Sequence, residues 1–330
     1  MKFFQPTKVL MNYSLKISIV LLVSALFLIS CKKSQPTTAT STPNAGATPV
    51  ATAVATPAPD PATEADLKQL RQTMEQEMKD QPENVHYNMG SAYLLARKSS
   101  EAAGEFKLAL AINAKDMASL TGLGRAYAQQ NLFTEAIAEY QKAININPND
   151  ATARLALGGA NLKLNRVDQA VAAFQESVKL DDKNPETHLR LGDVYLRQNK
   201  AQEAVAAYQQ AIKLRKDFAD AFFNLGNAYD RLGQFKEEAN AFEQVVRLNP
   251  QDADAHFNLA NTYGKLNQTD DAIRAFRQVV TLKPEDADGR YFLALQYLKK
   301  GDQIKAQEQY DSLKPLRPDL AEQLSTQMTK

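Results

Sequence analysis

The sequence predicts an all-α protein, an α-solenoid of seven 34-residue helix–turn–helix units, and two columns of residues support this prediction. When the chain is set out in rows of 34 residues from Glu83 to Leu320, one column holds a small residue in every row: Gly90, Gly124, Gly158, Gly192, Gly226, Ala260 and Ala294. Sixteen positions further along, every row holds an aromatic residue: Phe106, Tyr140, Phe174, Tyr208, Phe242, Phe276 and Tyr310. A period of this length indicates stacked units, none of which can bury its apolar face alone.

The apolar residues within a row have helical spacing. Leu120, Leu123 and Tyr127 lie on one face of a helix with about 3.6 residues per turn. After a short break, Ala136 and Tyr140 mark a second helix. The small residue of the first column lets one helix approach its partner closely, and the aromatic residue fills the remaining gap. We therefore expect each row to form a pair of packed helices.

Aspartate and proline are expected to mark the helix ends. Aspartate precedes the first helix in four rows, where its side chain can accept hydrogen bonds from free backbone amides: Asp116, Asp150, Asp252 and Asp286. Proline follows the second helix in four rows and is expected to stop it: Pro148, Pro250, Pro284 and Pro318. The helix boundaries should therefore repeat with the same period as the core.

This pattern resembles the tetratricopeptide-repeat (TPR) family. The second row carries the family pattern as Leu120, Leu123, Gly124, Tyr127, Ala136, Tyr140, Ala143 and Pro148. The resemblance implies a right-handed α-solenoid of seven units: 83–116, 117–150, 151–184, 185–218, 219–252, 253–286 and 287–320. Glu238 departs from the pattern in place of a small alanine, and Asn161 in place of a tyrosine. Pentatricopeptide repeats are similar in length and bind RNA, but the Tyr, Ala and Pro columns and a net charge of only +1 argue against nucleic-acid binding.

The first 30 residues have the pattern of a bacterial lipoprotein signal peptide. Lysines make a basic start, and 17–29 is an apolar run too short for a membrane-spanning helix, which needs ~20 residues. The run ends in Leu-Ile-Ser-Cys, which resembles a lipobox and implies cleavage before Cys31 and lipid attachment to this cysteine. Translation could begin at Met1 or at Met11.

The segment after the signal peptide is expected to be a tether. Cys31 is the only cysteine, so the chain cannot form an internal disulfide. Residues 31–59 are rich in Thr, Ala and Pro, which predicts a disordered linker. The segment of this composition, counted from Lys32 to Ala62, spans ~30 Å as a flexible coil and ~95 Å when fully extended in the polyproline form. The lipoprotein resemblance implies the bacterial cell envelope, and Lys32 in place of an aspartate favours the outer membrane, facing the periplasm, over the inner membrane.

Two apolar stripes flank the repeats and are expected to cover the open ends of the stack, as terminal repeats require. The first lies in 60–82, a predicted capping helix that opens at Asp60 and Pro61, and consists of Leu67, Leu70, Met74 and Met78. The second follows Pro318, extends into 321–330, and consists of Leu320, Leu324 and Met328. A membrane-surface helix is the alternative for the first stripe, but its polar face is acidic.

The sequence offers no catalytic, metal or cofactor motif. The three histidines share the fourth position of their rows and are expected to pack between two helices: His86, His188 and His256. Residues two or more rows apart cannot share a metal, because neighbouring helices lie ~8–10 Å apart. No His-Glu-x-x-His motif is present. We therefore predict a protein that is not an enzyme and takes no cofactor or small-molecule substrate; an enzyme with an unrecognised site is the alternative.

In the TPR family the first helices line a concave groove, and the resemblance assigns groove-facing positions here. The polar and basic residues at these positions include Asn224, Asn227, Asn258, Asn261, Arg231 and Lys265, and the aromatic ones are Phe223, Phe257 and Tyr291. Amides can pair with both polar groups of a peptide backbone, and aromatic side chains can anchor a ligand side chain. The alternative is that these residues are part of the framework, with the aromatic rings packed against the next helix.

The last repeat and the charge columns add two expectations. Phe292, Leu295 and Leu298 would form an apolar partner-binding patch unless the C-terminal helix folds over it. Basic residues at the ends of the first helices and acidic ones at their starts would give the groove two oppositely charged edges. The same charges would also offset the helix macrodipoles whatever the function.

The sequence therefore predicts a membrane-tethered interaction scaffold that binds peptide segments or partner proteins in its groove. Its membrane contact would be made through lipidated Cys31. The alternative is a structural subunit of an envelope assembly, such as pilus, secretion or cell-wall machinery, that uses convex or end surfaces instead.

Overall fold

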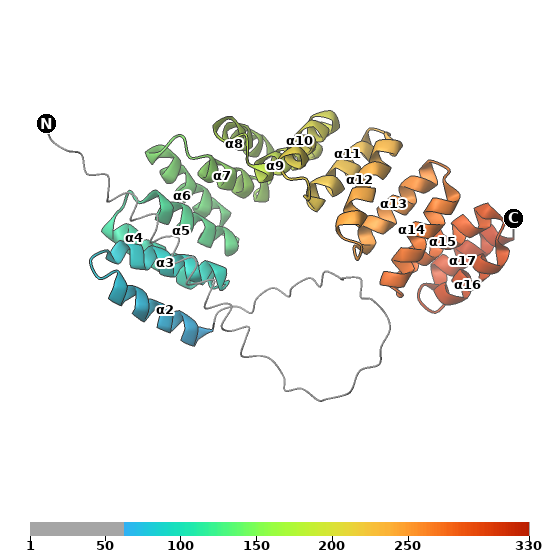
Figure 1. The fold of residues 1–330 in the computed structure, drawn as a ribbon, viewed down its shortest axis with the longest axis horizontal. Helices are drawn as coiled ribbons and strands as arrows, with labels where there is room; N and C mark the ends of the chain where they lie inside the picture. The colour runs from blue at the N-terminus through green and yellow to red at the C-terminus, as the bar shows by residue number, and fades with distance from the viewer. Residues whose placement is uncertain (1–62, 330) are drawn as a thin grey trace, which may run out of the picture. The chain divides into compact units, whose positions relative to one another are not determined.

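The computed structural model describes residues 63–329, and within this range all regular secondary structure is α-helical (Figure 1). The predicted all-α repeat fold is therefore confirmed. The predicted signal peptide, Cys31 and the linker lie outside the described residues. The chain divides into two compact units, one up to Pro148 and one from Asn149 onward.

The first unit consists of a single helix followed by two helix pairs. The single helix is α2 (Glu64–Glu77), and the pairs are α3 (Pro82–Leu95) with α4 (Ser99–Ile112), and α5 (Met117–Gln129) with α6 (Phe133–Ile146). Each first helix packs mainly against the second helix of its own pair, and α4 also packs against α5. The core is thus continuous from one pair to the next.

The second unit consists of five helix pairs and a final helix. The pairs are α7 (Ala151–Lys163) with α8 (Val167–Leu180), α9 (Pro185–Arg197) with α10 (Ala201–Leu214), α11 (Ala219–Arg231) with α12 (Phe235–Leu248), α13 (Ala253–Lys265) with α14 (Thr269–Leu282), and α15 (Ala287–Lys300) with α16 (Gln303–Leu313). The final helix is α17 (Pro318–Met328), which packs against α15 and α16.

The closest contact within a pair joins the small-residue column to the aromatic column. A Cβ atom on Gly192 would lie 2.5 Å from Cε1 of Tyr208, and one on Gly158 would lie 2.5 Å from Cε1 of Phe174. Real Cβ atoms do not approach a ring this closely, so glycine is required wherever the ring keeps its position. The expectation that small residues permit close approach and aromatic rings fill the gap is confirmed.

The turn inside each pair depends on one residue with a left-handed backbone. Seven residues at the same repeat position have φ between 56° and 81°: Arg97, Asn131, Asn165, Asn199, Gly233, Asn267 and Gly301. Glycine and asparagine adopt this conformation more readily than other residues, which explains six of the seven. Arg97 is the exception and stores backbone strain at the turn between α3 and α4.

The aspartate caps are confirmed, but the role assigned to proline is only partly correct. Asp252, like the other three predicted caps, accepts a hydrogen bond from a backbone amide in the first turn of its helix. Pro250 follows the end of α12, yet α8 ends at the equivalent residue, Leu180, without a proline. Pro318 is the first residue of α17, since α16 already ends at Leu313. The helix ends are therefore set by packing and turn geometry rather than by proline.

Both ends of the repeat array are covered, as predicted. Leu67, Leu70, Met74 and Met78 of α2 or its C-cap are buried against α3, and Leu324 of α17 is buried in a cluster with Leu313. The predicted opening of the first helix at Pro61 is wrong, because Thr63 is the N-cap of α2. Its side chain and that of Asp66 form a capping box, which satisfies the free amides at the helix start.

Two adjacent glycines in α7 should respond in opposite ways to alanine. Gly158→Ala places a methyl group against the buried ring of Phe174 and should destabilise the protein by about 1–3 kcal/mol. Gly159→Ala meets no atom within 4 Å and should stabilise it by about 1 kcal/mol through higher helix propensity. Thermal unfolding followed by circular dichroism measures both changes, and equal effects at the two sites would contradict the packing described.

The strained turn at Arg97 gives a second prediction. Arg97→Gly should stabilise the first unit by about 1 kcal/mol, because glycine adopts the observed φ of 58° without steric conflict. Gly233→Ala is the matched control at the same repeat position and should destabilise the second unit by a similar amount. Urea unfolding of both variants measures the changes, and a destabilised Arg97→Gly variant would show that the arginine side chain matters more than its backbone.

Candidate functional site

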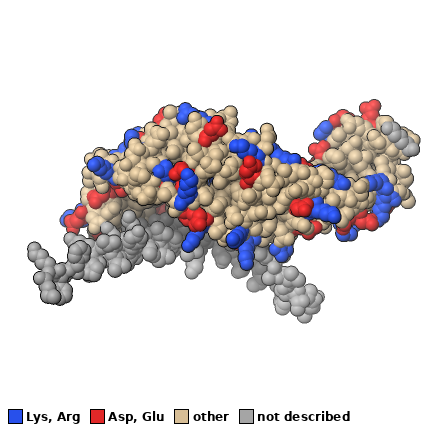
Figure 2. Space-filling view, turned by 90° about the horizontal axis from the view of Figure 1, so that it is seen from above, with Lys and Arg blue, Asp and Glu red and all other residues tan. Residues whose placement is uncertain are grey.

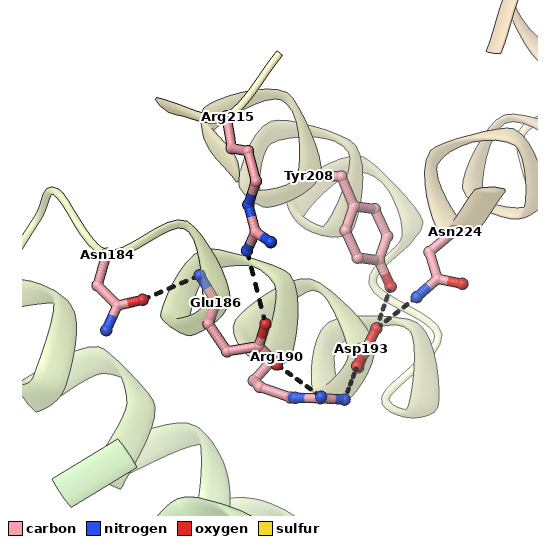
Figure 3. A network of polar contacts seen from close by, with 7 residues as sticks. All are labelled: Asn184, Glu186, Arg190, Asp193, Tyr208, Arg215 and Asn224. Atoms are coloured by element: carbon pink, nitrogen blue, oxygen red, sulfur yellow. Dashed lines mark hydrogen bonds and ion pairs between the residues drawn. The ribbon is translucent and has the colours of Figure 1, made fainter. Parts of the chain in front are cut away.

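The four predicted groove asparagines lie half-buried on α11 and α13, but they differ in their contacts. Asn224 is already engaged, because its Nδ2 donates a hydrogen bond of 2.9 Å to Oδ1 of Asp193 on α9 (Figure 3). The side chains of Asn227, Asn258 and Asn261 make no hydrogen bond to any residue in the range 63–329. We call these three residues the amide cluster.

Asp193 is the centre of a polar network that joins three helices (Figure 3). Its Oδ1 accepts hydrogen bonds of 2.9 Å from both the Tyr208 hydroxyl on α10 and the Asn224 amide on α11. Its Oδ2 lies 3.4 Å from a guanidinium nitrogen of Arg190 on α9 itself. One carboxylate therefore links a helix pair to the first helix of the next pair.

The network continues along α9 to its N-terminus. Arg190 forms an ion pair of 2.6 Å with Glu186, and Arg215 lies 3.8 Å from the other oxygen of that carboxylate. Asn184 caps the helix by accepting a hydrogen bond from the Glu186 backbone amide. These outer charges are exposed, and ion pairs in water contribute little to stability. The contacts of the half-buried Asp193 are the structurally important part.

Burial dominates the protonation behaviour of this network. Burial raises the pKa of Asp193 and outweighs the lowering effects of Tyr208, Arg190 and Asn224. Burial also raises the pKa of Tyr208, and the neighbouring Asp193 raises it further. The phenol therefore keeps its proton at neutral pH and remains a donor to Asp193.

Two members of the amide cluster occupy the positions that Asp193 and Asn224 occupy one repeat earlier. Asn227 stands in α11 where Asp193 stands in α9, and Asn258 stands in α13 where Asn224 stands in α11. Replacing the charged acceptor by a neutral amide leaves Asn258 without the contact that holds Asn224. Both of its polar atoms thus remain available to a ligand.

The predicted aromatic residues pack partly into the core. The ring of Phe223 lies edge-to-face 5.5 Å from that of Phe242. Phe257 makes similar contacts with Phe276 at 5.7 Å and with Phe292 at 5.8 Å. All three of the predicted aromatic residues, Phe223, Phe257 and Tyr291, keep part of their surface accessible to solvent. The same aromatic side chains therefore pack against neighbouring helices and keep some surface exposed to solvent.

The C-terminal helix covers part of the predicted apolar patch. Tyr291, Leu295 and Leu298 of α15 pack against the cluster that includes Leu324 of α17. Phe292 packs in the other direction, stacked on Phe276 at 5.9 Å. The sequence analysis allowed for a C-terminal helix that folds over the patch, and the structure has this arrangement. The patch residues are therefore half-buried and do not form one open surface.

The basic residues at the ends of the first helices bridge neighbouring repeats. Arg231 donates a hydrogen bond of 2.7 Å to the carbonyl oxygen of Leu196, in the last turn of α9. Lys265 donates hydrogen bonds to Asp230 and Glu238. Charges of both signs lie interspersed on the visible face of the molecule (Figure 2). The two predicted groove cations therefore have contacts within the chain that sequence reasoning did not assign.

Each of the three histidines has a polar contact: that of His86 joins the two helices of its pair, as expected, whereas His188 and His256 contact backbone carbonyls that precede their own helices. His188 is buried, and its Nε2 lies 2.9 Å from the carbonyl oxygen of Asp182. His86 contacts the carboxylate of Glu105 at 2.9 Å, and His256 the carbonyl oxygen of Pro250 at 3.1 Å. Among residues 63–329, no group of three His, Cys, Asp or Glu side chains could hold a metal ion. In the same range, no helix is both long and apolar enough to cross a membrane.

Helix pairs in a constant 34-residue period, with a polar surface on the first helices, define a repeat scaffold of the TPR type. Over residues 45–295 the chain matches the sequence model of the C-terminal domain of cilia and flagella-associated protein 70, and it belongs to this family of tetratricopeptide-repeat domains. No curated protein matches the chain.

Solved structures with a similar fold include several bacterial TPR proteins. The C-terminal part of a TPR protein from Cytophaga hutchinsonii has a TM-score of 0.61 and 15% identity, over 71% of this chain and 96% of that one. PilF from Pseudomonas aeruginosa has a TM-score of 0.53 and 21% identity, over 65% and 97%. YrrB, described as a TPR protein with an unusual peptide-binding site, has a TM-score of 0.51 and 23% identity, over 60% and 99%. These likenesses support the fold.

Sequence reasoning missed the role of Asp193, although a signal was present. The equivalent position in the other repeats holds no acid, so Asp193 is a departure within its own column. Two residues that could have drawn attention to it, Tyr208 and Asn224, were instead attributed to the core and to the groove. Only the three-dimensional structure shows that the side chains of Asp193, Tyr208 and Asn224 meet.

Removing the Asp193 carboxylate should destabilise the second unit. Asp193→Ala leaves the hydroxyl of the fully buried Tyr208 and the Asn224 amide without their acceptor, which should cost about 1–3 kcal/mol. Glu186→Ala removes an exposed ion pair from the same helix and should cost less than about 1 kcal/mol. Urea unfolding compares the two variants, and equal losses would contradict the central place of Asp193.

Proposed function

We propose that this protein is a membrane-tethered scaffold of the bacterial cell envelope that binds extended peptide segments of partner proteins on the first helices of repeats five and six. The amide cluster carries this proposal. The side chains of Asn227, Asn258 and Asn261, on the first helices of two successive repeats, make no hydrogen bond within residues 63–329, whereas the equivalent of Asn258 one repeat earlier, Asn224, donates one to Asp193.

The spacing of the first helices suits an extended ligand. Neighbouring packed helices lie ~8–10 Å apart, and an extended chain advances ~3.3 Å per residue. Equivalent amides on successive first helices would therefore meet the backbone of an extended peptide at about every third residue. Each amide can donate to a peptide carbonyl and accept from a peptide N–H, so binding of this kind depends on backbone geometry more than on sequence.

The half-buried aromatic residues supply an apolar border to the amide cluster. Phe223 and Phe257 each pack edge-to-face against a ring of a second helix and remain half-buried, with part of their surface open to solvent. A fixed ring loses little conformational freedom when it contacts a ligand, which favours its use as an anchor. We infer that an apolar side chain of the peptide lies against the exposed surface of these two rings.

The tether and the location are supported by the sequence. The Leu-Ile-Ser-Cys motif supports lipid attachment at Cys31, and the Thr-, Ala- and Pro-rich segment after it supports a spacer between the lipid and the repeats. Lys32 after the cysteine supports the outer membrane, facing the periplasm. Radiolabelled palmitate incorporation in wild type and its loss in Cys31→Ala would test the attachment.

Substitutions at the amide cluster should weaken peptide binding without loss of stability. A peptide selected from a random-sequence phage library on the folded protein provides the probe. Asn227→Ala and Asn258→Ala should each raise its Kd about 2- to 10-fold, because each removes hydrogen bonds with a net value of about 0.5–1.5 kcal/mol. Fluorescence anisotropy measures the Kd, and circular dichroism confirms an unchanged melting temperature.

Asn224→Ala is the matched control, since Asn224 has the same side chain but is engaged by Asp193. It should lower the melting temperature and change the Kd less than Asn258→Ala does. A selected peptide that binds all variants equally, or whose binding depends only on residues of the second helices, would refute the proposed site.

A further inference from the structure

Glu238 is a buried carboxylate at a position where the other repeats have alanine. It lies on α12 and is only 3% exposed. The equivalent residues in the other six repeats are all fully buried alanines: Ala102, Ala136, Ala170, Ala204, Ala272 and Ala306. The fold therefore does not require a carboxylate here, and the cost of burying one calls for specific partners.

Its partners come from the first helix of the next repeat. Oε1 of Glu238 lies 2.7 Å from Oγ1 of Thr262 and 3.3 Å from Nζ of Lys265, both on α13. Lys265 also donates a hydrogen bond to Asp230 on α11 and lies over the ring of Phe235. The titratable groups that face Glu238 are thus Asp230 from α11 and Lys265 from α13.

The hydroxyl of Thr262 has fewer protons than its two contacts require. Oγ1 lies 2.7 Å from the Glu238 carboxylate and 2.8 Å from the carbonyl oxygen of Asn258. Both are acceptors when Glu238 is charged, but a hydroxyl has only one hydrogen to donate. If Glu238 carries a proton, it donates to Thr262, and Thr262 donates to Asn258. All three groups are then satisfied.

We propose that Glu238 is a proton-operated link between repeats five and six. In its charged form it shares Lys265 with Asp230 and draws the lysine toward α12. In its protonated form it donates to Thr262, and Lys265 pairs with Asp230 alone. The link thus exchanges one set of contacts between α11, α12 and α13 for another when a proton is gained or lost. It does not require the function proposed for the amide cluster, although it includes the backbone carbonyl of Asn258.

The electrostatics agree with this arrangement and fix the sign of the pH dependence. Burial raises the pKa of Glu238 above the ordinary value of 4.5 and outweighs the lowering effects of Thr262 and Lys265. A native state that holds the proton more tightly than the unfolded chain loses stability as the pH rises. The contribution of the protonated form is complete below pH 4.5 and is lost as the pH rises through the pKa of the folded protein.

Nuclear magnetic resonance of the side-chain carboxyl carbons tests the link directly. The Glu238 signal, assigned by its absence in Glu238→Gln, should titrate with a midpoint above 4.5 in the folded protein. The neighbouring Glu237 is exposed on the same helix, and Glu237→Gln provides the matched control. A Glu238 midpoint at or below 4.5 would overturn the proposal.

Unfolding as a function of pH supplies a second, independent readout. Glu238→Ala restores the residue of the other six repeats and should fold. Its melting temperature should increase relative to wild type as the pH rises from 4 to 7, because the wild type loses the contribution of the protonated acid. Glu237→Ala should show no such trend. A constant difference between Glu238→Ala and wild type across this range would also overturn the proposal.

Discussion

The contact between a small residue on each first helix and an aromatic ring on its partner is the constraint on which the rest of the structure depends. In five repeats even one added methyl group would overlap the ring. The rings of Phe106, Phe174 and Tyr208 are completely buried, so they cannot turn aside into solvent. This contact fixes the separation and rotation of the two helices, and it thereby determines which side chains of a first helix face away from its partner.

Most of the fold could be predicted because its determinants recur at a fixed interval. The small and aromatic columns, the aspartate caps and the two end helices need only local spacing, and the structure has all of them, although the first end helix begins later than predicted. Two details could not be derived in this way. The left-handed turn residue is Asn or Gly in six repeats but Arg in one, and the second helices of the first six repeats end at the same position with or without proline. Both reflect backbone geometry imposed by packing.

The candidate site was less predictable, because it depends on departures from the repeat. Asn224 and Asn258 are identical in residue type and repeat position, and the sequence treated them alike. Their difference arises from the preceding repeat, where Asp193 engages Asn224 while Asn227 does not engage Asn258. Glu238 likewise depends on another repeat, because its carboxylate contacts Thr262 and Lys265 on the first helix of the next repeat. A comparison of equivalent positions in the repeats does not reveal contacts between residues of different repeats.

Partners are proposed to bind on the first helices of repeats five and six. Photo-crosslinking in cells tests this proposal most directly, with a benzophenone amino acid at Asn261 of the amide cluster and, for comparison, at the exposed Gln210 on the second helix α10. We expect a specific crosslinked partner from position 261, which is lost when Asn227 and Asn258 are both replaced by alanine, and no crosslinked partner from position 210. Crosslinks from position 210 alone would contradict the proposal and would assign binding to the surface of the second helices.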